Sequence, residues 1–250
     1  GVSFNSGVSC KLIDGNRGMF NNEQLIKSIN PPDFYHSPKT SLVCIENTTN
    51  KGGGACWDLN ELKLIKKTCQ ENKLSFHLDG ARIWNAMIKM NQDPKDYGLL
   101  FDSISVCLSK GLGCPAGSVL VGSEDLINRA IRVRKVLGGG MRQVGYLAAC
   151  GIYALKNNFL RLSDDHKRAL EIETQLKSLP FIKKVEPVET NIVIFEINSK
   201  ISSELFLKKL NEKGVKIISM GDNKLRVVTH LDYTNLMHNK FLELLSQLKF

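Results

Sequence analysis

The sequence has 250 residues and a mass of 27.9 kDa, with 42% hydrophobic and 24% charged residues. This composition excludes intrinsic disorder and fibrous architectures, and the length predicts one or two domains. Apolar runs are only a few residues long, so we expect no membrane-spanning helix and no membrane partner. The N-terminus does not resemble a signal peptide, and we therefore expect a cytoplasmic protein. The net charge of +9 is compatible with a polyanionic partner or with an ordinary basic enzyme.

The cysteines and histidines do not form a metal-binding pattern. Seven cysteines are widely spaced and no CxxC motif occurs, which favours buried, reduced thiols over a disulfide framework. His77 and Asp79 could supply two metal ligands, but no third ligand lies near them in the sequence. We expect no metal. The cysteines are Cys10, Cys44, Cys56, Cys69, Cys107, Cys114 and Cys150.

Short β-rich runs alternate with segments of helical periodicity in the first part of the chain. For example, Leu59, Leu62, Ile65 and Cys69 have helical spacing, and Asp58 precedes them as an N-cap. This alternation predicts an α/β fold with a mostly parallel sheet flanked by helices. The predicted strands are 41–45, 74–79, 103–108 and 118–122; the predicted helices are 59–71, 81–90, a basic helix ending before Gly138, and an apolar helix, 141–155, buried between layers.

The composition becomes polar between residues 156 and 165, and a different order of elements begins. We therefore predict a boundary between a large α/β domain, 1–158, and a smaller C-terminal α+β domain, 159–250. The predicted elements of the second domain are helices over 169–179, 203–211 and 237–248 and strands over 191–197, 215–218 and 225–229.

Two polar residues follow predicted neighbouring strands: Asp79 ends one strand, and Lys110 follows the next. Ligands of parallel α/β sheets bind outside the carboxyl ends of the strands, so we expect both residues to face one crevice. A lysine placed there can form a Schiff base with an aldehyde cofactor, while an aspartate keeps a pyridine nitrogen protonated. This division of roles is typical of pyridoxal phosphate chemistry. The lysine taken alone would be interpreted as an ordinary exposed loop residue.

Other nucleotide and nucleic-acid sites are disfavoured. Gly111-x-Gly113 lacks the third glycine of a dinucleotide-binding turn, and no phosphate-binding loop motif is present. An acid-free basic stretch suits phosphate or carboxylate groups better than a nucleic-acid surface, and it could equally be a solvated helix face. It contains Arg129, Arg132, Arg134, Lys135 and Arg142.

Around these residues the sequence resembles the low-specificity and L-allo-threonine aldolases, pyridoxal-phosphate enzymes with the aspartate-aminotransferase fold, fold type I. The resemblance covers nearly the whole chain, in order. It runs through Ile45-Glu46-Asn47-Thr48, Asp79-Gly80-Ala81-Arg82 with Trp84-Asn85-Ala86, Leu108-Ser109-Lys110-Gly111-Leu112-Gly113, Gly138-Gly139-Gly140-Met141-Arg142-Gln143 and Leu225-Arg226-Val227-Val228-Thr229-His230.

The resemblance implies roles for four residues at the cofactor and the substrate. Lys110 would carry pyridoxal 5'-phosphate as a Schiff base, and Asp79 would pair with its ring nitrogen. Arg82 and Arg226 would hold the substrate carboxylate, a task that suits the forked guanidinium group.

Three further residues match positions near the family's site. His36 is similar to a histidine on a mobile loop close to the substrate β-hydroxyl, and would act there as a base. Lys135 and Arg142 resemble basic residues that reach the cofactor or substrate, partly across a subunit interface. An ordinary loop histidine and a solvated helix face are the alternatives.

The sequence departs from the family at its start. Family members have a segment of on the order of 100 residues, a small domain's length, before the point where this sequence begins. That segment holds a Gly-Thr turn for the cofactor phosphate and a histidine that stacks on the ring, and we expect a chain lacking it to be a fragment or to bind cofactor poorly. Cys114 stands where the family usually has another small residue.

The implied reaction is cleavage of threonine or allo-threonine to glycine and an aldehyde. Two alternatives stay open: another fold type I lyase that catalyses β-elimination, and a truncated, inactive subunit that assembles with a full-length partner. The resemblance also implies a homotetramer.

Overall fold

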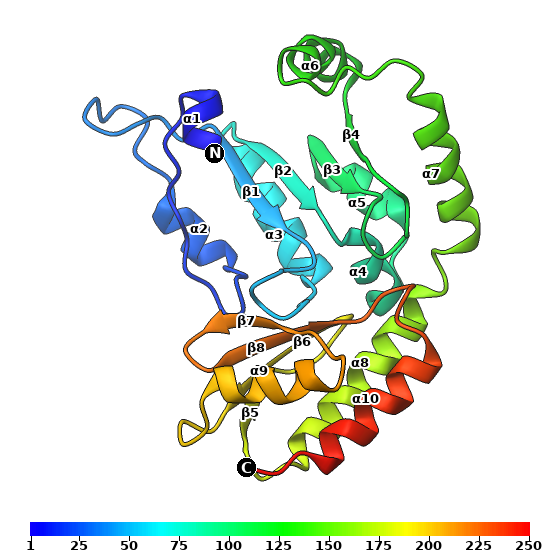
Figure 1. The fold of residues 1–250 in the computed structure, drawn as a ribbon. Helices are drawn as coiled ribbons and strands as arrows, with labels where there is room; N and C mark the ends of the chain where they lie inside the picture. The colour runs from blue at the N-terminus through cyan, green and yellow to red at the C-terminus, as the bar shows by residue number, and fades with distance from the viewer.

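Two four-stranded sheets organise the computed structural model, which describes residues 1–250 (Figure 1). In the first sheet, in the order β1-β2-β3-β4, the first three strands are parallel and β4 is antiparallel to β3. The second sheet, in the order β5-β6-β8-β7, is antiparallel throughout. The strands are β1 (Leu42–Glu46), β2 (Ser75–Gly80), β3 (Ser103–Cys107), β4 (Ser118–Gly122), β5 (Ile182–Val185), β6 (Ile192–Ile197), β7 (Ile218–Gly221) and β8 (Lys224–Val228).

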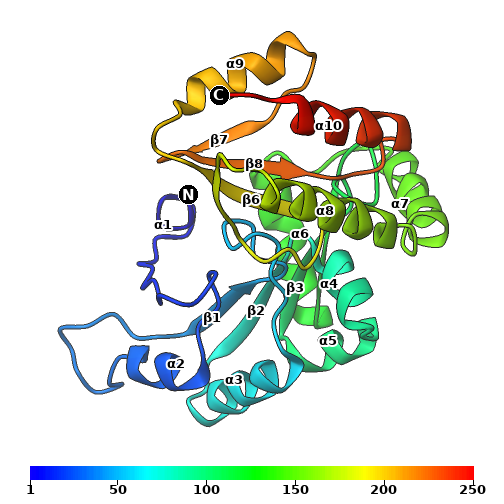
Figure 2. The ribbon, with the colours of Figure 1, turned by 90° about the horizontal axis from the view of Figure 1, so that it is seen from below.

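Each sheet has its own hydrophobic core. Side chains of α3, α4 and α5 pack against one face of the first sheet, and α8, α9 and α10 enclose a second core with β6 and β8 (Figure 2). The helices are α1 (Val2–Ser6), α2 (Asn22–Ser28), α3 (Leu59–Glu71), α4 (Ile83–Met90), α5 (Pro94–Leu100), α6 (Glu124–Val136), α7 (Gly145–Asn157), α8 (Leu162–Lys177), α9 (Ser203–Glu212) and α10 (Asn235–Gln247).

Local sequence explains how the first sheet is built. The Asp58 carboxylate caps α3 by accepting from the Asn60 and Glu61 amides at 2.8 and 3.1 Å, and Leu62 and Ile65 turn into the core. Along β2, buried residues alternate with more exposed ones, as expected of a strand packed on one face. The mostly parallel first sheet and the antiparallel C-terminal sheet, each with its helices, therefore confirm the predicted fold class. The domain division at residue 158 stays a prediction.

Two predicted elements were wrong. The strand predicted over 215–218 lies instead at β7, because Asp222 and Asn223, both with positive φ, form the tight turn that pairs β7 with β8. The helix predicted over 141–155 begins later, as α7, and is not buried between layers, since only Gly151 and Ala154 along it are buried. The sequence analysis did not predict α1, α2, α5 or β5.

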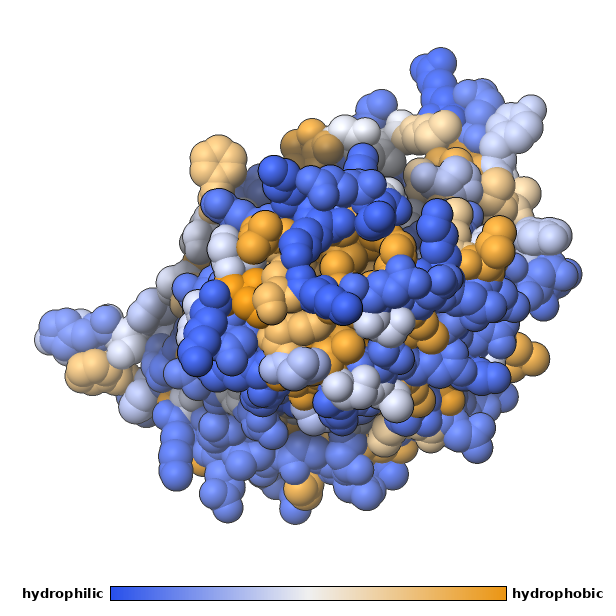
Figure 3. Space-filling model, turned by 60° about the horizontal axis from the view of Figure 1, so that its bottom comes forward, coloured by the Kyte–Doolittle hydropathy of each residue, from blue (hydrophilic) through white to orange (hydrophobic).

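The cysteine prediction was correct for pairing and partly wrong for burial. All seven thiols are free, but only Cys56, Cys69 and Cys114 are buried. Large apolar side chains are also exposed, among them Val133 and Tyr153 at 56% and 65%. On the face drawn in Figure 3, apolar side chains gather near the middle within a mainly hydrophilic surface. No helix has the length and apolar character needed to cross a membrane.

Candidate active site

The carboxyl ends of β1, β2 and β3 form a polar row that faces the second sheet (Figure 1). In the parallel register, Glu46 pairs with Asp79, and Asp79 pairs with Ser105. Because the side-chain period of a strand is two, these three residues share one face of the sheet. The opposite face holds Ile45 and Leu78 in the core. Asp79 thus lies at the predicted edge of the sheet, together with Glu46 and Ser105, which were not predicted as site residues.

Asp79 is exposed at the end of β2, and its carboxylate accepts only the Ala81 amide, at 3.1 Å. It forms no salt bridge. Gly80 follows because a Cβ there would lie 2.7 Å from the Ser105 carbonyl oxygen, so the strands could not approach as they do. The Asp79 carboxylate is therefore free to accept a hydrogen bond from a ligand.

Lys110 lies on a tight loop directly after β3 and is exposed. Its carbonyl accepts the Gly113 amide at 2.9 Å, and Gly113 has a φ of 78°, a conformation that favours glycine. Leu112 anchors the loop by burying its side chain almost completely. The Asn158 amide group donates to the Leu112 carbonyl at 2.7 Å. The lysine therefore projects from a fixed backbone, and it forms no salt bridge.

Cys107 belongs to this site, although the sequence analysis gave it no role. Its Sγ lies 3.5 Å from the Ser109 hydroxyl. Burial raises the pKa of the Cys107 thiol, but hydrogen bonds from Ser109 and Lys110 together with the Lys110 charge outweigh it, and the pKa is lowered overall. The Lys110 charge thus favours the thiolate form of Cys107. The sequence signal that could have predicted this thiol is its position at the end of a strand, three residues before Lys110.

Arg82, just after β2, lies near Arg226 of the second sheet. Arg82 is the N-cap residue of α4, and Arg226 is on β8, where its Nη1 donates to Asn50 Oδ1 at 2.9 Å. Burial lowers the pKa of Arg82; the nearby Glu46 carboxylate opposes this effect, and the Arg226 charge adds to it. Two guanidinium groups near one another and near Asp79 attract an anion. The two arginines are thus close enough for their charges to interact, and their role at a substrate carboxylate stays a prediction.

Three predicted residues are not beside Asp79 and Lys110. His36 is exposed between α2 and β1, where its ring packs against Tyr35 with the centroids 3.9 Å apart and the planes tilted by 36°. Lys135 and Arg142 are exposed on α6 and just after it. Because β4 is antiparallel, it carries the chain to the opposite end of the sheet before α6 begins (Figure 1). No hydrogen bond or salt bridge links these three residues to the other predicted site residues, and their roles stay predictions.

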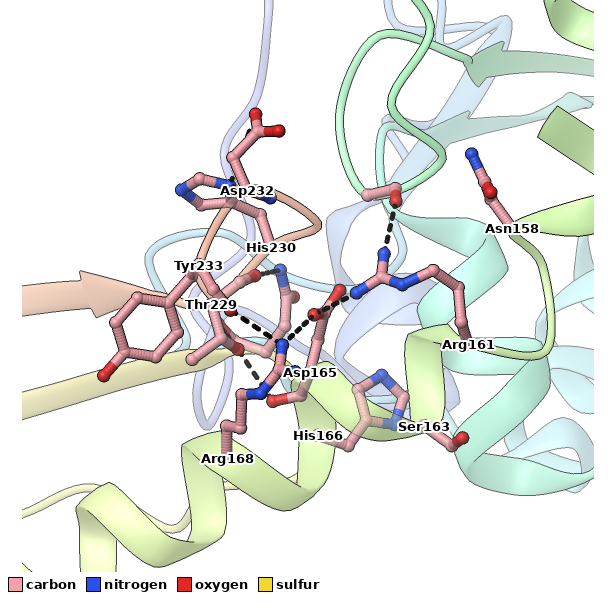
Figure 4. Close-up of polar contacts among 12 residues, drawn as sticks. Asn158, Arg161, Ser163, Asp165, His166, Arg168, Thr229, His230, Asp232 and Tyr233 are labelled. Atoms are coloured by element: carbon pink, nitrogen blue, oxygen red, sulfur yellow. Dashed lines mark hydrogen bonds and ion pairs between the residues drawn. The ribbon is translucent and has the colours of Figure 1, made fainter. Parts of the chain in front are cut away.

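A buried charge cluster near the start of α8 supports the lysine loop (Figure 4). Asp165 is completely buried, and its Oδ1 lies 2.5 Å from Arg161 Nη2 and 3.7 Å from Arg168 Nη1. Arg161 Nη1 also donates to the Gly111 carbonyl at 3.4 Å, and the Thr229 hydroxyl donates to the Asp165 carbonyl at 2.7 Å. Burial raises the pKa of Asp165 against the opposing effect of Arg161 and Arg168. The cluster links the loop after Lys110 to the strand of Arg226.

The contacts of this cluster were not predicted from the sequence. Its only sequence signal is the spacing of Arg161, Asp165 and Arg168, which places the three on one side of a helix. His166, the next residue, is also buried, and its Nε2 lies 3.0 Å from Asn85 Oδ1. Burial lowers the pKa of His166 to about 4, so the ring is neutral near pH 7.

This arrangement defines a class of protein. A mostly parallel sheet joined to an antiparallel sheet is the architecture called fold type I, which this chain shares with solved structures of threonine aldolases. Solved structures of other proteins have a similar fold. A threonine aldolase from Leishmania major has a TM-score of 0.77 at 20% identity, over 93% of this chain and 68% of the other. The histidinol-phosphate aminotransferase from Clostridium acetobutylicum has a TM-score of 0.67, also at 20% identity and with the same coverage of both chains.

Sequence comparison specifies the family. Residues 1–200 match the family described as beta-eliminating lyase, and the chain belongs to it. Low-specificity L-threonine aldolase 1 from Arabidopsis thaliana is 36% identical over 241 residues, 94% of this chain. The low specificity L-threonine aldolase of Escherichia coli K12 is 41% identical over 203 residues, 80% of this chain. The chain spans 67% and 58% of the length of these two relatives.

Proposed function

We propose that this chain cleaves threonine or allo-threonine between Cα and Cβ, giving glycine and acetaldehyde, with pyridoxal 5'-phosphate as its cofactor. The observation that carries the proposal is the juxtaposition of Asp79 and Lys110 with the pair Arg82 and Arg226. The similarity to threonine aldolases supports the choice of reaction. A Schiff-base lysine alone would suit several reactions on amino acids.

The side chains present fit this cofactor. Asp79 has a carboxylate free of any salt bridge, and Lys110 has an amine free of any salt bridge on the adjacent strand end. Lys110 would hold the aldehyde carbon, and Asp79 would hold a proton at the ring nitrogen. The bound cofactor supplies an electron sink for the bond that breaks at Cα.

The remaining steps fall to side chains of this chain. Arg82 and Arg226 would bind the substrate carboxylate and so orient the Cα–Cβ bond for cleavage. The Lys110 amine, once released by the substrate amine, would be free to move a proton at Cα. His36 is the proposed base for the β-hydroxyl, a role that requires the exposed segment before β1 to approach the strand ends when substrate binds.

Lys110 provides the decisive test. Borohydride reduction of the chain with added pyridoxal phosphate should attach the cofactor to Lys110, detected by mass spectrometry, and threonine should yield glycine and acetaldehyde. Lys110→Ala should abolish both results, whereas Lys63→Ala, an exposed helix position, should change neither. Cofactor attachment elsewhere, or none at all, contradicts the proposal. Attachment at Lys110 without turnover would favour the inactive-subunit alternative.

The matched family favours β-elimination as the second candidate reaction. Product analysis separates the two. If the chain catalyses β-elimination, serine and threonine would release ammonia and a 2-oxo acid in place of glycine.

We also propose a homotetramer in the cytoplasm. The exposed apolar side chains of α6 and α7 support self-association, and the seven free thiols suit a reducing compartment. Light scattering of the purified chain measures the oligomeric state, and a monomer would refute the homotetramer. Imaging of the tagged chain in cells tests the cytoplasmic location.

A further inference from the structure

Arg226 is held on one side only. Its Nη1 donates to Asn50 Oδ1 at 2.9 Å, across a sequence separation of 176 residues. Its Nε is buried and has no hydrogen-bond partner. A buried N–H group without a partner is unfavourable, so this atom is available to donate to an incoming acceptor group.

Asn50 is itself fixed by its surroundings. The backbone N–H of Asn50 donates to Glu46 Oε2 at 3.0 Å, and its backbone carbonyl accepts the Gly53 amide at 3.4 Å. The same turn is attached to the second sheet, since the Thr190 hydroxyl donates to the Gly54 carbonyl at 2.7 Å. The Asn50 side chain therefore meets Arg226 from a backbone that is anchored at both sheets.

The shape of a guanidinium group gives this contact a consequence. A guanidinium group can bind a carboxylate with two parallel hydrogen bonds, either through Nη1 and Nη2 or through Nε and Nη2. In Arg226, Asn50 engages Nη1 and leaves Nε open. The edge left for a two-point contact is therefore the one formed by Nε and Nη2.

We propose that Asn50 is a positioning residue that presents the Nε and Nη2 edge of Arg226 to the carboxylate of an amino-acid ligand. This inference rests on the proposed function for the identity of that ligand. Asn50 suits the role because it is neutral: it orients Arg226 without cancelling its charge. The nearby Arg82 guanidinium adds a second positive charge that a carboxylate would balance.

An aspartate in place of Asn50 tests the charge argument. Asn50→Asp keeps an acceptor near Nη1 but adds a negative charge that competes with the ligand, so the KM for threonine should rise about tenfold or more while kcat changes little. The KM for threoninamide, which has no carboxylate, should rise much less. Asn60→Asp, which adds the same charge at an exposed helix position, should leave both substrates unchanged.

A second readout is independent of catalysis. In an NMR spectrum of arginine Nε–H groups, the signal missing from Arg226→Lys identifies Arg226. Adding glycine to the wild-type chain should shift that signal, and half-saturation should need about tenfold more glycine in Asn50→Asp than in Asn60→Asp.

The outcomes separate the two claims. If the wild-type chain does not cleave threonine while glycine still moves the Arg226 signal in an Asn50-dependent way, the proposed function fails and the positioning role stands. The positioning role is overturned if glycine leaves the Arg226 signal in place, if both asparagine variants bind glycine equally, or if threoninamide is affected as strongly as threonine.

Discussion

Replacing Asp165 with asparagine should destabilise the chain by about 3 kcal/mol, because breaking a buried ion pair costs about 3–5 kcal/mol. Asp165 is completely buried, and the side chains of its partners Arg161 and Arg168 are only 17% and 15% exposed. Asparagine keeps an acceptor for Arg161 but removes the negative charge, and its amide would replace Oδ2, which has no partner. Burial of the carboxylate is itself unfavourable, which places the expected cost at the lower end of the range.

Urea denaturation followed by circular dichroism measures this cost. The adjacent Asp164 is exposed in the first turn of α8, so Asp164→Asn is a matched control with an expected change within about 0.5 kcal/mol. Because Arg161 also binds the Gly111 carbonyl, the Gly113 amide should exchange hydrogen faster in Asp165→Asn. Equal stabilities of the two variants would refute the assignment of Asp165 as a charge anchor.

Burial and electrostatics give three more expected outcomes. The folded-state pKa of His166, about 4, lies below the ordinary value of 6.5, so its contribution to stability is complete above pH 6.5 and is lost as the pH falls toward 4. The maximum loss is about 3 kcal/mol, and His166→Gln should flatten the pH profile of the urea midpoint; an unchanged slope would contradict this. The lowered pKa of Cys107 predicts faster alkylation by iodoacetamide than for an ordinary cysteine, and Lys110→Ala should slow it; equal rates in the two chains would show that the lysine does not activate the thiol. Gly98 lies in α5, and no atom lies within 4 Å of the position that a Cβ would take there. Gly98→Ala should therefore stabilise the chain by up to about 1 kcal/mol in thermal unfolding, and a loss of stability would contradict the open surroundings.

Errors in the predicted fold have identifiable physical causes. An apolar segment predicted a buried helix at 141–155, but apolarity alone does not say which layer will cover α7, and most of that helix is exposed. The short helix α5 was missed because it has few residues to show a period, although Asp93 and Pro94 form an N-terminal signal.

The local parts of the site could be predicted from the sequence. Alternation along β2 turned Asp79 away from the core, and the glycines after β3 fixed a tight loop at Lys110. Both features depend on neighbours a few residues apart, where strand period and backbone sterics are sufficient. The blocks that resemble threonine aldolases are likewise contiguous in the sequence.

Which distant residues meet depends on the packing of whole elements. The antiparallel direction of β4 places Lys135 and Arg142 at the end of the sheet opposite Asp79, and no local pattern encodes that direction. The contact between Asn50 and Arg226 and the burial of Asp165 depend on how the two sheets pack together. Such contacts arise from the burial of apolar surface over whole elements, so the individual residues they join cannot be read from the spacing along the chain.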